Sequence, residues 1–247
     1  MNNTLAIIGC GGSGSWAVQM LSKSPKRELD IILVDGDKWE QKNADRCLVP
    51  PRHIGRHKIT SSRDLLERAG WLGQVSSWPH YLALGTEAWN DLRVRSGQLQ
   101  VLSCVDNHAA RRLCLRLADE RAQDNLETIV VLTGNEMKSA SADVYLPSWR
   151  GSKLDPRVRY PEIETSDEGN PLHPSCTGEA AESSPQLALA NGLSAFSGLW
   201  LMQLWAEEEP ARRGGEYYRE IMDSVPISIQ WTALKQTMLT RKDVENE

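Results

Sequence analysis

The stretch that decides the fold is Leu5-Ala6-Ile7-Ile8-Gly9-Cys10-Gly11-Gly12-Ser13-Gly14-Ser15. Its first four residues are apolar and predict a short buried strand that ends at the first glycine. Ser13 or Ser15 can cap a helix whose first apolar residue is Trp16. The stretch therefore predicts a strand, a glycine turn and a helix in direct succession.

The glycines of this turn are spaced as in turns that hold a phosphate. They allow the chain to turn tightly, to bring its backbone against a phosphate and to pack the helix on the strand. An anion can then sit at the positive N-terminus of the helix. The candidate residues are Gly9, Gly11, Gly12 and Gly14. Because similar glycine turns also occur in proteins where they bind no phosphate, the function of this turn depends on the residues around it.

The overall composition is that of a soluble protein with a substantial core, since 40% of its 247 residues are hydrophobic. The net charge of −5 and the pI near 5.6 give no electrostatic reason to bind nucleic acid or an anionic membrane. No apolar run approaches the roughly 20 residues of a membrane span, and no basic leader precedes the first strand. We expect a cytoplasmic protein without nucleic-acid or membrane partners.

The cysteines are odd in number and scattered, and no two form a Cys-x-x-Cys pair. They are Cys10, Cys47, Cys104, Cys114 and Cys176. This pattern favours neither a disulfide framework nor a zinc site, so we expect no zinc and mostly buried thiols.

The second apolar run, residues 31–34, ends at Asp35, which lies 21 residues after Gly14. In a dinucleotide-binding fold an acidic residue at this place accepts the ribose hydroxyls. The alternative is a loop carboxylate that only caps the end of the strand.

Polar and cationic residues gather in the loop that follows this strand. They include Asp37, Asn43, Arg46 and Lys58. A triphosphate needs such a set, because an arginine grips phosphate oxygens with a fork, a lysine adds a point charge and an asparagine donates to a bridging oxygen. Taken singly, Arg46 and Lys58 could equally be solvated surface charges.

A further apolar strand, residues 99–105, delivers Asp106 to the same edge of the sheet as Asp35. Asn107 can cap the helix that follows. A carboxylate beside a phosphate site is a candidate magnesium ligand. The alternative is that Asp106 serves as the helix cap.

Strands and helices alternate through about residue 135, which predicts parallel strands covered on both faces. The other expected helices are residues 59–68 and 87–94, and the other strands are residues 75–82, 128–132 and 142–146. We therefore predict an α/β, Rossmann-like fold whose mostly parallel sheet carries helices on both faces, with a long crossover loop and late antiparallel edge strands.

Residues 147–185 contain six prolines and little periodicity, which predicts a long crossover loop. Cys176 lies in this segment, where exposure would favour reactivity. No lysine or arginine is close to it in sequence, and Glu179 disfavours a thiolate. Cys176 is thus either an acceptor thiol or a plain loop residue.

The C-terminal part begins with an apolar stretch, residues 186–205, that predicts a helix buried against the sheet or a partner subunit. Residues 225–231 predict a late edge strand, and residues 240–247 a frayed tail. We expect one domain over residues 1–247, with a nucleotide-binding half (1–146), the crossover loop (147–185) and a helix-and-strand region (186–247).

Together the motifs resemble the adenylation domain of the ThiF, MoeB and ubiquitin-activating enzyme superfamily. Their order and spacing match over roughly residues 5 to 115. The matching motifs are Gly9-x-Gly11-Gly12-x-Gly14, Asp35-x-Asp37, Asn43-x-x-Arg46, Gly55-x-x-Lys58 and Cys104-Val105-Asp106-Asn107 followed by Arg111.

The resemblance implies a role for each of these polar residues. Asp35 would bind ribose, Asn43, Arg46 and Lys58 would bind phosphates, and Asp106 would hold Mg²⁺. Pro174-Ser175-Cys176 before a long apolar helix is similar to the place where the family carries the cysteine that receives the activated carboxyl group.

A narrower likeness involves the C-terminal half of the chain. The run Pro174-Ser175-Cys176-Thr177-Gly178-Glu179-Ala180, then Asn191 and Leu199-Trp200, with Gly134-Asn135 earlier, resembles the ThiF-type proteins of bacterial plasmid PRTRC gene clusters.

The family resemblance implies an ATP- and Mg²⁺-dependent adenylyltransferase that activates the C-terminal carboxylate of a ubiquitin-like or sulfur-carrier-like protein, with thioester transfer to Cys176 as a further step. It also implies a homodimer or an operon-encoded partner. Family homodimers carry an N-terminal helix whose arginine reaches the partner's ATP, and the printed chain begins almost at the first strand.

Two alternatives remain. One is a nucleotide-binding scaffold of the same fold that has lost turnover. The other is an NAD-dependent oxidoreductase, which the glycine turn and Asp35 allow, but which gives no role to Asn43, Arg46, Lys58 and Asp106.

Overall fold

The structure is a computed structural model that describes residues 3–24, 29–44, 46–135, 139–165, 188–208, 225–232, 235–240 and 243–244. Its strands are β1 (Thr4–Ile8), β2 (Asp30–Val34), β3 (Val75–Trp78), β4 (Leu99–Ser103), β5 (Thr128–Asn135), β6 (Ser139–Tyr145), β7 (Pro226–Thr232) and β8 (Lys235–Thr240). They form one eight-stranded sheet in the order β3-β2-β1-β4-β5-β6-β7-β8. The first five in this order pair in parallel, and β6, β7 and β8 are antiparallel.

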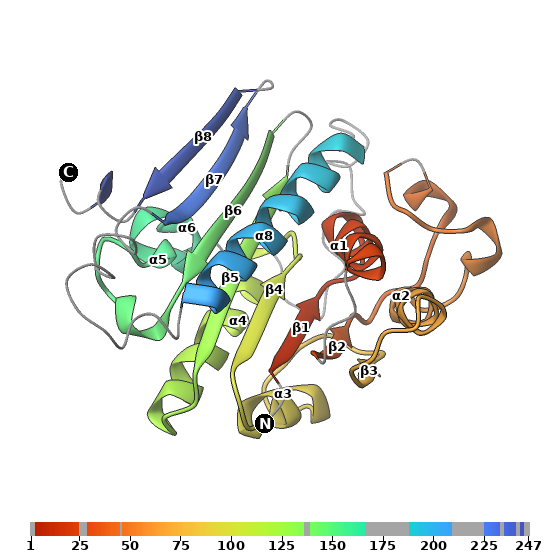
Figure 1. Cartoon of the computed structure of the whole chain (residues 1–247), viewed down its shortest axis with the longest axis horizontal. Helices are drawn as coiled ribbons and strands as arrows, with labels where there is room; N and C mark the ends of the chain where they lie inside the picture. The colour runs from red at the N-terminus through yellow and green to blue at the C-terminus, as the bar shows by residue number, and fades with distance from the viewer. Residues whose placement is uncertain are drawn as a thin grey trace.

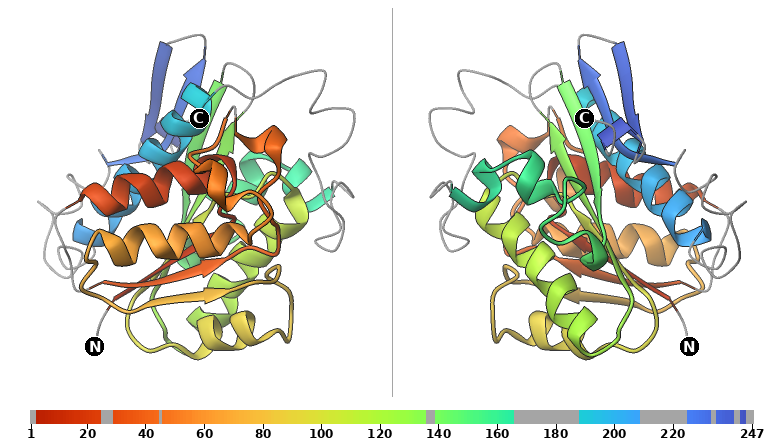
Figure 2. Two further views of the ribbon diagram at one scale, coloured as in Figure 1. Left: turned by 90° about the vertical axis from the view of Figure 1, so that its right-hand side faces the viewer. Right: turned by 90° about the vertical axis from the view of Figure 1, so that its left-hand side faces the viewer.

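Helices cover both faces of this sheet. They are α1 (Gly12–Lys23), α2 (Lys58–Arg68), α3 (Glu87–Val94), α4 (His108–Gln123), α5 (Pro156–Arg159), α6 (Glu162–Thr165) and α8 (Ala188–Glu208), with short 3₁₀ turns η1 (Gln41–Asn43), η2 (Pro51–His53) and η3 (Pro147–Trp149). Helices α1, α2 and α8 lie on one face, and α3 to α6 lie on the other (Figures 1 and 2). The expected Rossmann-like α/β fold is confirmed.

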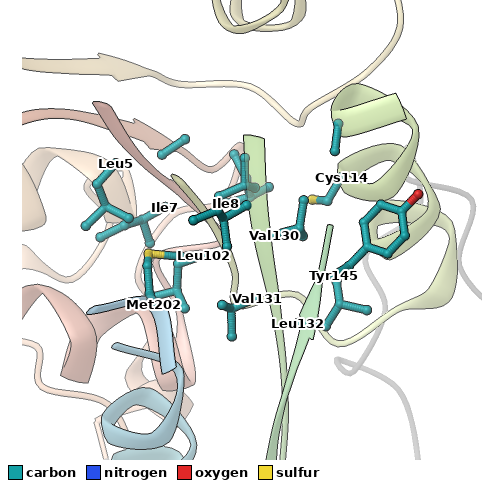
Figure 3. Packing of buried hydrophobic residues seen from close by; sticks show 14 of the residues in the cluster. Leu5, Ile7, Ile8, Leu102, Cys114, Val130, Val131, Leu132, Tyr145 and Met202 are labelled. Atoms are coloured by element: carbon teal, nitrogen blue, oxygen red, sulfur yellow. The ribbon is translucent and has the colours of Figure 1, made fainter. Parts of the chain in front are cut away.

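The core forms where the central strands meet helices on both sides. Strands β1, β4 and β5 are buried along most of their length because they have neighbours on each edge and helices on each face. Figure 3 shows Cys114 of α4 and Tyr145 of β6 beside Val130, whereas Met202 of α8 lies next to Leu102. Among the described helices, none is long and apolar enough to cross a membrane.

Four predicted strands differ clearly in length from the observed ones. The strand predicted at residues 142–146 spans Ser139–Tyr145. The strand predicted at residues 75–82 ends at Trp78, because Pro79 cannot donate to the ladder. The strand predicted at 99–105 ends at Ser103, so that residues 104–107 form a turn at the sheet edge. Strand β5 extends three residues beyond its prediction, to Asn135.

The segment after β6 contains more structure than the predicted loop. It forms η3, α5 and α6, and it buries Trp149, Leu154 and Ile163 against the main core. Asp155 caps α5, since its side chain accepts from the Arg157 N–H, and Pro156 occupies the first helical turn. Such short helices leave no periodic signal in the sequence. Cys176 lies outside the described residues.

The C-terminal strands correct two expectations. Residues 225–231 were predicted as an edge strand, but β7 pairs with both β6 and β8 and is interior. Residues 240–247 were predicted as a frayed tail, but Thr240 is the last residue of β8 and Val244 is buried. Strand β8, Lys-Gln-Thr-Met-Leu-Thr, was missed because its mixed polar sequence suits an exposed edge.

Candidate functional site

The glycine turn has a geometry that only glycine allows at two positions. Gly9 has a φ of +89°, and a Cβ there would lie 2.7 Å from the Cys104 carbonyl oxygen. A Cβ on Gly14 would lie 2.0 Å from the Gly9 carbonyl oxygen. Helix α1 can therefore pack directly on the turn, as the glycine spacing predicts.

The N-terminus of α1 has no side-chain cap, because Gly11 occupies the N-cap position. The predicted caps Ser13 and Ser15 are instead inside the helix, where the Ser15 hydroxyl donates to the Gly12 carbonyl. The N–H groups of the first helical turn thus meet no capping side chain, which is the arrangement that favours an anion.

A cavity of about 450 Å³ opens at this helix terminus, between the carboxyl ends of β1, β2 and β4. The predicted residues that line it are Gly9, Gly11, Gly12, Asp35, Asp37, Asn43, Arg46, Lys58 and Asp106. Gly14 supports the turn from behind without lining the cavity. The structure therefore brings together residues that are up to about one hundred positions apart in the sequence.

Asp35 is buried and fastens the turn to the loop after β2. Its carboxylate accepts the Cys10 N–H and the Asp37 N–H, each at 2.7 Å. Burial raises the pKa of this carboxyl above its ordinary value, although Lys58 and the two N–H donors oppose that shift. Each carboxylate oxygen retains a lone pair, so the two backbone bonds leave acceptor capacity for a ligand hydroxyl.

Lys58, the first residue of α2, brings its ammonium to the glycine turn. Its Nζ lies 2.8 Å from Asp37 Oδ2 and 5.8 Å from the centre of the Trp39 ring. A Cβ on Gly11 would be 3.5 Å from this Nζ. Burial opposes the charged form, but the carboxylates of Asp35 and Asp37 outweigh it and raise the pKa of Lys58. The lysine is therefore fully charged where a phosphate could bind.

The loop between β2 and α2 supplies Asn43 and Arg46. Asn43 Oδ1 accepts the Glu40 N–H at 2.9 Å, which leaves the Nδ2 group as a donor for a ligand. The loop is tied to α1, because the Ser15 hydroxyl accepts the Leu48 N–H at 3.2 Å. Arg46 is half-buried at the cavity wall.

Asp106 and Asn107 follow β4 and have different roles. Asn107 Oδ1 accepts the Ala110 N–H at 2.8 Å and is the N-cap of α4. The alternative that Asp106 is the cap is therefore wrong. Asp106 is exposed and lines the cavity, which leaves its carboxylate accessible to a ligand.

The cavity lining also includes Tyr81, Asn135 and Asn191, to which the sequence motifs assign no role. Tyr81 lies against Gly36 and donates its hydroxyl to Asp37. Asn135, at the end of β5, donates to the side chain of Asn191 in α8. Tyr81 carries no sequence signal, but both asparagines belong to the narrower family pattern in the C-terminal half.

Two cysteines also line the cavity. Burial raises the pKa of the Cys47 thiol, against the opposing charges of Arg46 and Lys58. Burial likewise raises the pKa of Cys104, to about 12. Both thiols are therefore protonated and weakly nucleophilic at neutral pH.

Comparison with families of known proteins matches residues 2–142 to the ThiF family. The chain belongs to the ThiF family. The match covers more than half of the chain and includes every part of the cavity described above except Asn191.

The curated relatives of this ThiF-family chain include two proteins named ubiquitin-like modifier-activating enzyme 5. Ubiquitin-like modifier-activating enzyme 5 of Caenorhabditis briggsae is 32% identical over 136 residues, which cover 51% of this chain and 31% of that protein. The enzyme of the same name from Gallus gallus is 31% identical over 136 residues, covering 51% of this chain and 33% of that protein. The chain thus spans about a third of the length of the curated relatives it matches.

Solved structures with this fold include two crystallised with ATP. Escherichia coli MccB with ATP has a TM-score of 0.58 and 18% identity, covering 96% of this chain and 63% of that one. Escherichia coli TcdA, a tRNA N6-threonylcarbamoyladenosine dehydratase, in complex with ATP has a TM-score of 0.57 and 15% identity, covering 85% and 88%. At these identities the likeness establishes the shared fold.

Proposed function

We propose that this chain uses ATP and Mg²⁺ to adenylate the C-terminal carboxylate of a small ubiquitin-like or sulfur-carrier-like protein. The observation that carries the proposal is the single cavity that joins an uncapped helix N-terminus to Lys58, Arg46 and the carboxylates of Asp35 and Asp106. The relatives are activating enzymes of ubiquitin-like modifiers, and two structural neighbours hold ATP, which supports the same assignment.

The chemical step needs charge stabilisation more than proton transfer. A carboxylate oxygen of the carrier forms a bond to the α-phosphorus, the bond from that phosphorus to the bridging oxygen breaks, and pyrophosphate leaves with the electron pair. Because the attacking carboxylate is already ionised at neutral pH, no general base is required. Lys58 and Arg46 would stabilise the charge that grows on the leaving group.

Asp106 fits the role of a magnesium ligand. Magnesium is commonly held by one or two carboxylates together with substrate phosphates, and Asp106 presents one accessible carboxylate beside the glycine turn. In the described part of the chain, no three His, Cys, Asp or Glu side chains gather to form a metal site of their own. Bound there, Mg²⁺ would neutralise charge on the departing pyrophosphate.

A second cavity offers a path for the carrier's C-terminus. Its volume is about 500 Å³, and it meets the first cavity at Asp106 and Asn135, which line both. Strands β5, β6 and β7 and helix α6 form its walls. An extended peptide end lying there would bring its terminal carboxylate to the phosphate side of Asp106.

Two features of the proposal lie beyond the described residues. Cys176 would accept the activated carboxyl group as a thioester, with AMP as the leaving group. The other feature is a protein partner, which would be a second copy of the chain or an operon-encoded protein.

Calorimetric titration tests the nucleotide assignment without a carrier. We expect ATP with Mg²⁺ to bind and NADH not to bind, and we expect Arg46→Ala to weaken ATP binding by about tenfold or more, the scale of a charge-assisted contact. Binding of NADH without binding of ATP·Mg would revive the oxidoreductase alternative. Binding of ATP without carrier-dependent pyrophosphate exchange would favour the scaffold.

A further inference from the structure

Asn191 connects three parts of the cavity that are far apart in the sequence. It lies in the first turn of the described part of α8, it is completely buried, and yet it lines the cavity. Its side chain accepts a hydrogen bond from Asn135 Nδ2 and donates one from Nδ2 to the Arg46 carbonyl at 3.3 Å.

The orientation of the Asn191 amide follows from its partners. A backbone carbonyl only accepts, so the group that faces Arg46 must be the NH₂ end of the amide. The oxygen end then faces Asn135 and the glycine turn. A Cβ on Gly12 would lie 2.5 Å from this oxygen, so the amide rests directly on the turn.

The Arg46 carbonyl receives a second donor. Trp16 Nε1 of α1 also donates to it, at 3.3 Å. Two donors from two helices thus hold one backbone oxygen, and both lone pairs of that oxygen are used. The backbone of Arg46 is therefore fixed relative to the N-terminus of α1, where a phosphate would bind.

We propose that Asn191 is a positioning residue for Arg46, and that it holds the guanidinium at the phosphate site. The proposal rests on the proposed function, which assigns Arg46 to the phosphates of ATP. Asn191 carries no charge and contributes through the backbone of Arg46. Its effect should therefore depend on the presence of the arginine side chain.

A purely structural role predicts a different pattern. A buried amide whose only task is packing would lower the stability of the chain when removed, but would leave the ATP affinity of the folded protein unchanged. A double-mutant cycle separates the two roles, because coupled residues give non-additive effects and independent residues give additive ones.

The experiment titrates ATP·Mg into four proteins by calorimetry, well below their unfolding temperatures. They are the unsubstituted chain, Asn191→Ala, Arg46→Ala and the double variant. We expect Asn191→Ala to weaken ATP binding about fivefold to tenfold, the scale of one or two lost hydrogen bonds. In the Arg46→Ala background, the same change should leave the dissociation constant within about twofold, because no guanidinium remains to be placed.

Two further variants control for folding. Asn191→Leu fills about the same volume without adding charge but loses both hydrogen bonds, so it should weaken ATP binding as Asn191→Ala does. Ser197→Ala removes a fully buried hydroxyl of the same helix that accepts from Trp231 Nε1 at 2.8 Å. Ser197 does not line the cavity, so this variant should lower the melting temperature and leave the ATP affinity unchanged.

The outcomes are distinguishable. Equal weakening by Asn191→Ala in both backgrounds would overturn the positioning role, and so would unchanged affinity in Asn191→Ala and Asn191→Leu while Arg46→Ala loses affinity. If the unsubstituted chain does not bind ATP, the proposed function itself fails.

Discussion

Lys58 Nζ lies 2.8 Å from Asp37 Oδ2, and the other oxygen of Asp37 accepts the Tyr81 hydroxyl. The carboxylate thus holds the lysine against the glycine turn before any nucleotide is present. Burial raises the pKa of Asp37, but the charge of Lys58 and the hydrogen bonds from Lys58 and Tyr81 outweigh burial and leave that pKa below its ordinary value of 3.8.

This shift predicts an acid-dependent loss of stability. A carboxyl whose pKa is lowered by folding contributes stability above its unfolded pKa, and loses that contribution as the pH falls through the folded pKa. Replacing Asp37 with Asn removes this contribution, so the free energy of unfolding should fall less steeply below about pH 4 than in the unsubstituted chain. Urea unfolding of both proteins between pH 7 and pH 2.5 measures the free energy of unfolding at each pH. Asp124→Asn, at an exposed ion pair with Arg93, is the control, and an equal flattening there would contradict the prediction.

The close packing of α1 on the turn predicts a strong effect at Gly14. The Cβ of Gly14→Ala would lie 2.0 Å from the Gly9 carbonyl oxygen, so the helix must shift, at a cost on the order of 3 kcal/mol in the free energy of unfolding. Gly192→Ala in α8 is the matched control, because its Cβ would lie 3.6 Å from Trp16 and alanine favours a helix by about 1 kcal/mol. Denaturant unfolding of both variants checks the difference, and equal destabilisation would show that the turn is not tight.

A network of ion pairs lies on the face of the sheet that α4 and α5 cover, opposite to α1. It predicts a difference in stability between two arginine variants. Arg157 contacts Asp119 at 2.8 Å and Asp155 at 2.9 Å, and its side chain is only 14% exposed. Arg157→Ala leaves the buried Asp155 without its cation and the buried Asp119 with only the exposed Arg150, and it should destabilise the chain by about 3 kcal/mol. Arg150 contacts the same Asp119 at 3.4 Å but is 64% exposed, so Arg150→Ala should cost less than about 1 kcal/mol. Thermal unfolding of the pair tests this, and similar losses would argue that the network is not desolvated.

Cys176 remains a prediction from the sequence. If it is the acceptor thiol, Cys176→Ala should keep ATP–pyrophosphate exchange and lose any reducible adduct with the carrier, because adenylation and transfer are separate steps. A non-reducing gel after incubation with carrier, ATP and Mg²⁺ measures the adduct. The thiols of Cys10, Cys104 and Cys114 serve as internal controls, since burial raises the pKa of each. An adduct that persists in Cys176→Ala would assign the chemistry to another thiol.

The sequence predicts those parts of the fold whose signal is local. Apolar runs such as residues 31–34 mark buried strands, and the glycine spacing marks the turn and its helix. Strand β8 escaped prediction because an exposed edge tolerates polar residues, and η3, α5 and α6 escaped because such short helices carry no periodicity.

The residues of the candidate site also fall into two groups, those that sequence motifs predict and those that only tertiary packing brings together. Asp35 and Lys58 are found by their spacing from Gly14 and Gly55, and Arg46 by its spacing from Asn43. The bond between Asn191 and Arg46 joins residues 145 positions apart, and only the tertiary packing of α8 on α1 brings them together. Spacing along the chain contains no information about such a pair.

Carrier-dependent pyrophosphate exchange tests the central claim most directly. Labelled pyrophosphate should enter ATP only when the chain is mixed with Mg²⁺ and a small ubiquitin-like or sulfur-carrier-like protein whose C-terminal carboxylate is free. The same carrier with a C-terminal amide should be inactive. Arg46→Ala and Asp106→Ala should each slow the exchange by about 2 to 4 kcal/mol in transition-state free energy. Exchange at the parental rate in both variants, or exchange that does not require a free carboxylate, would contradict the assignment.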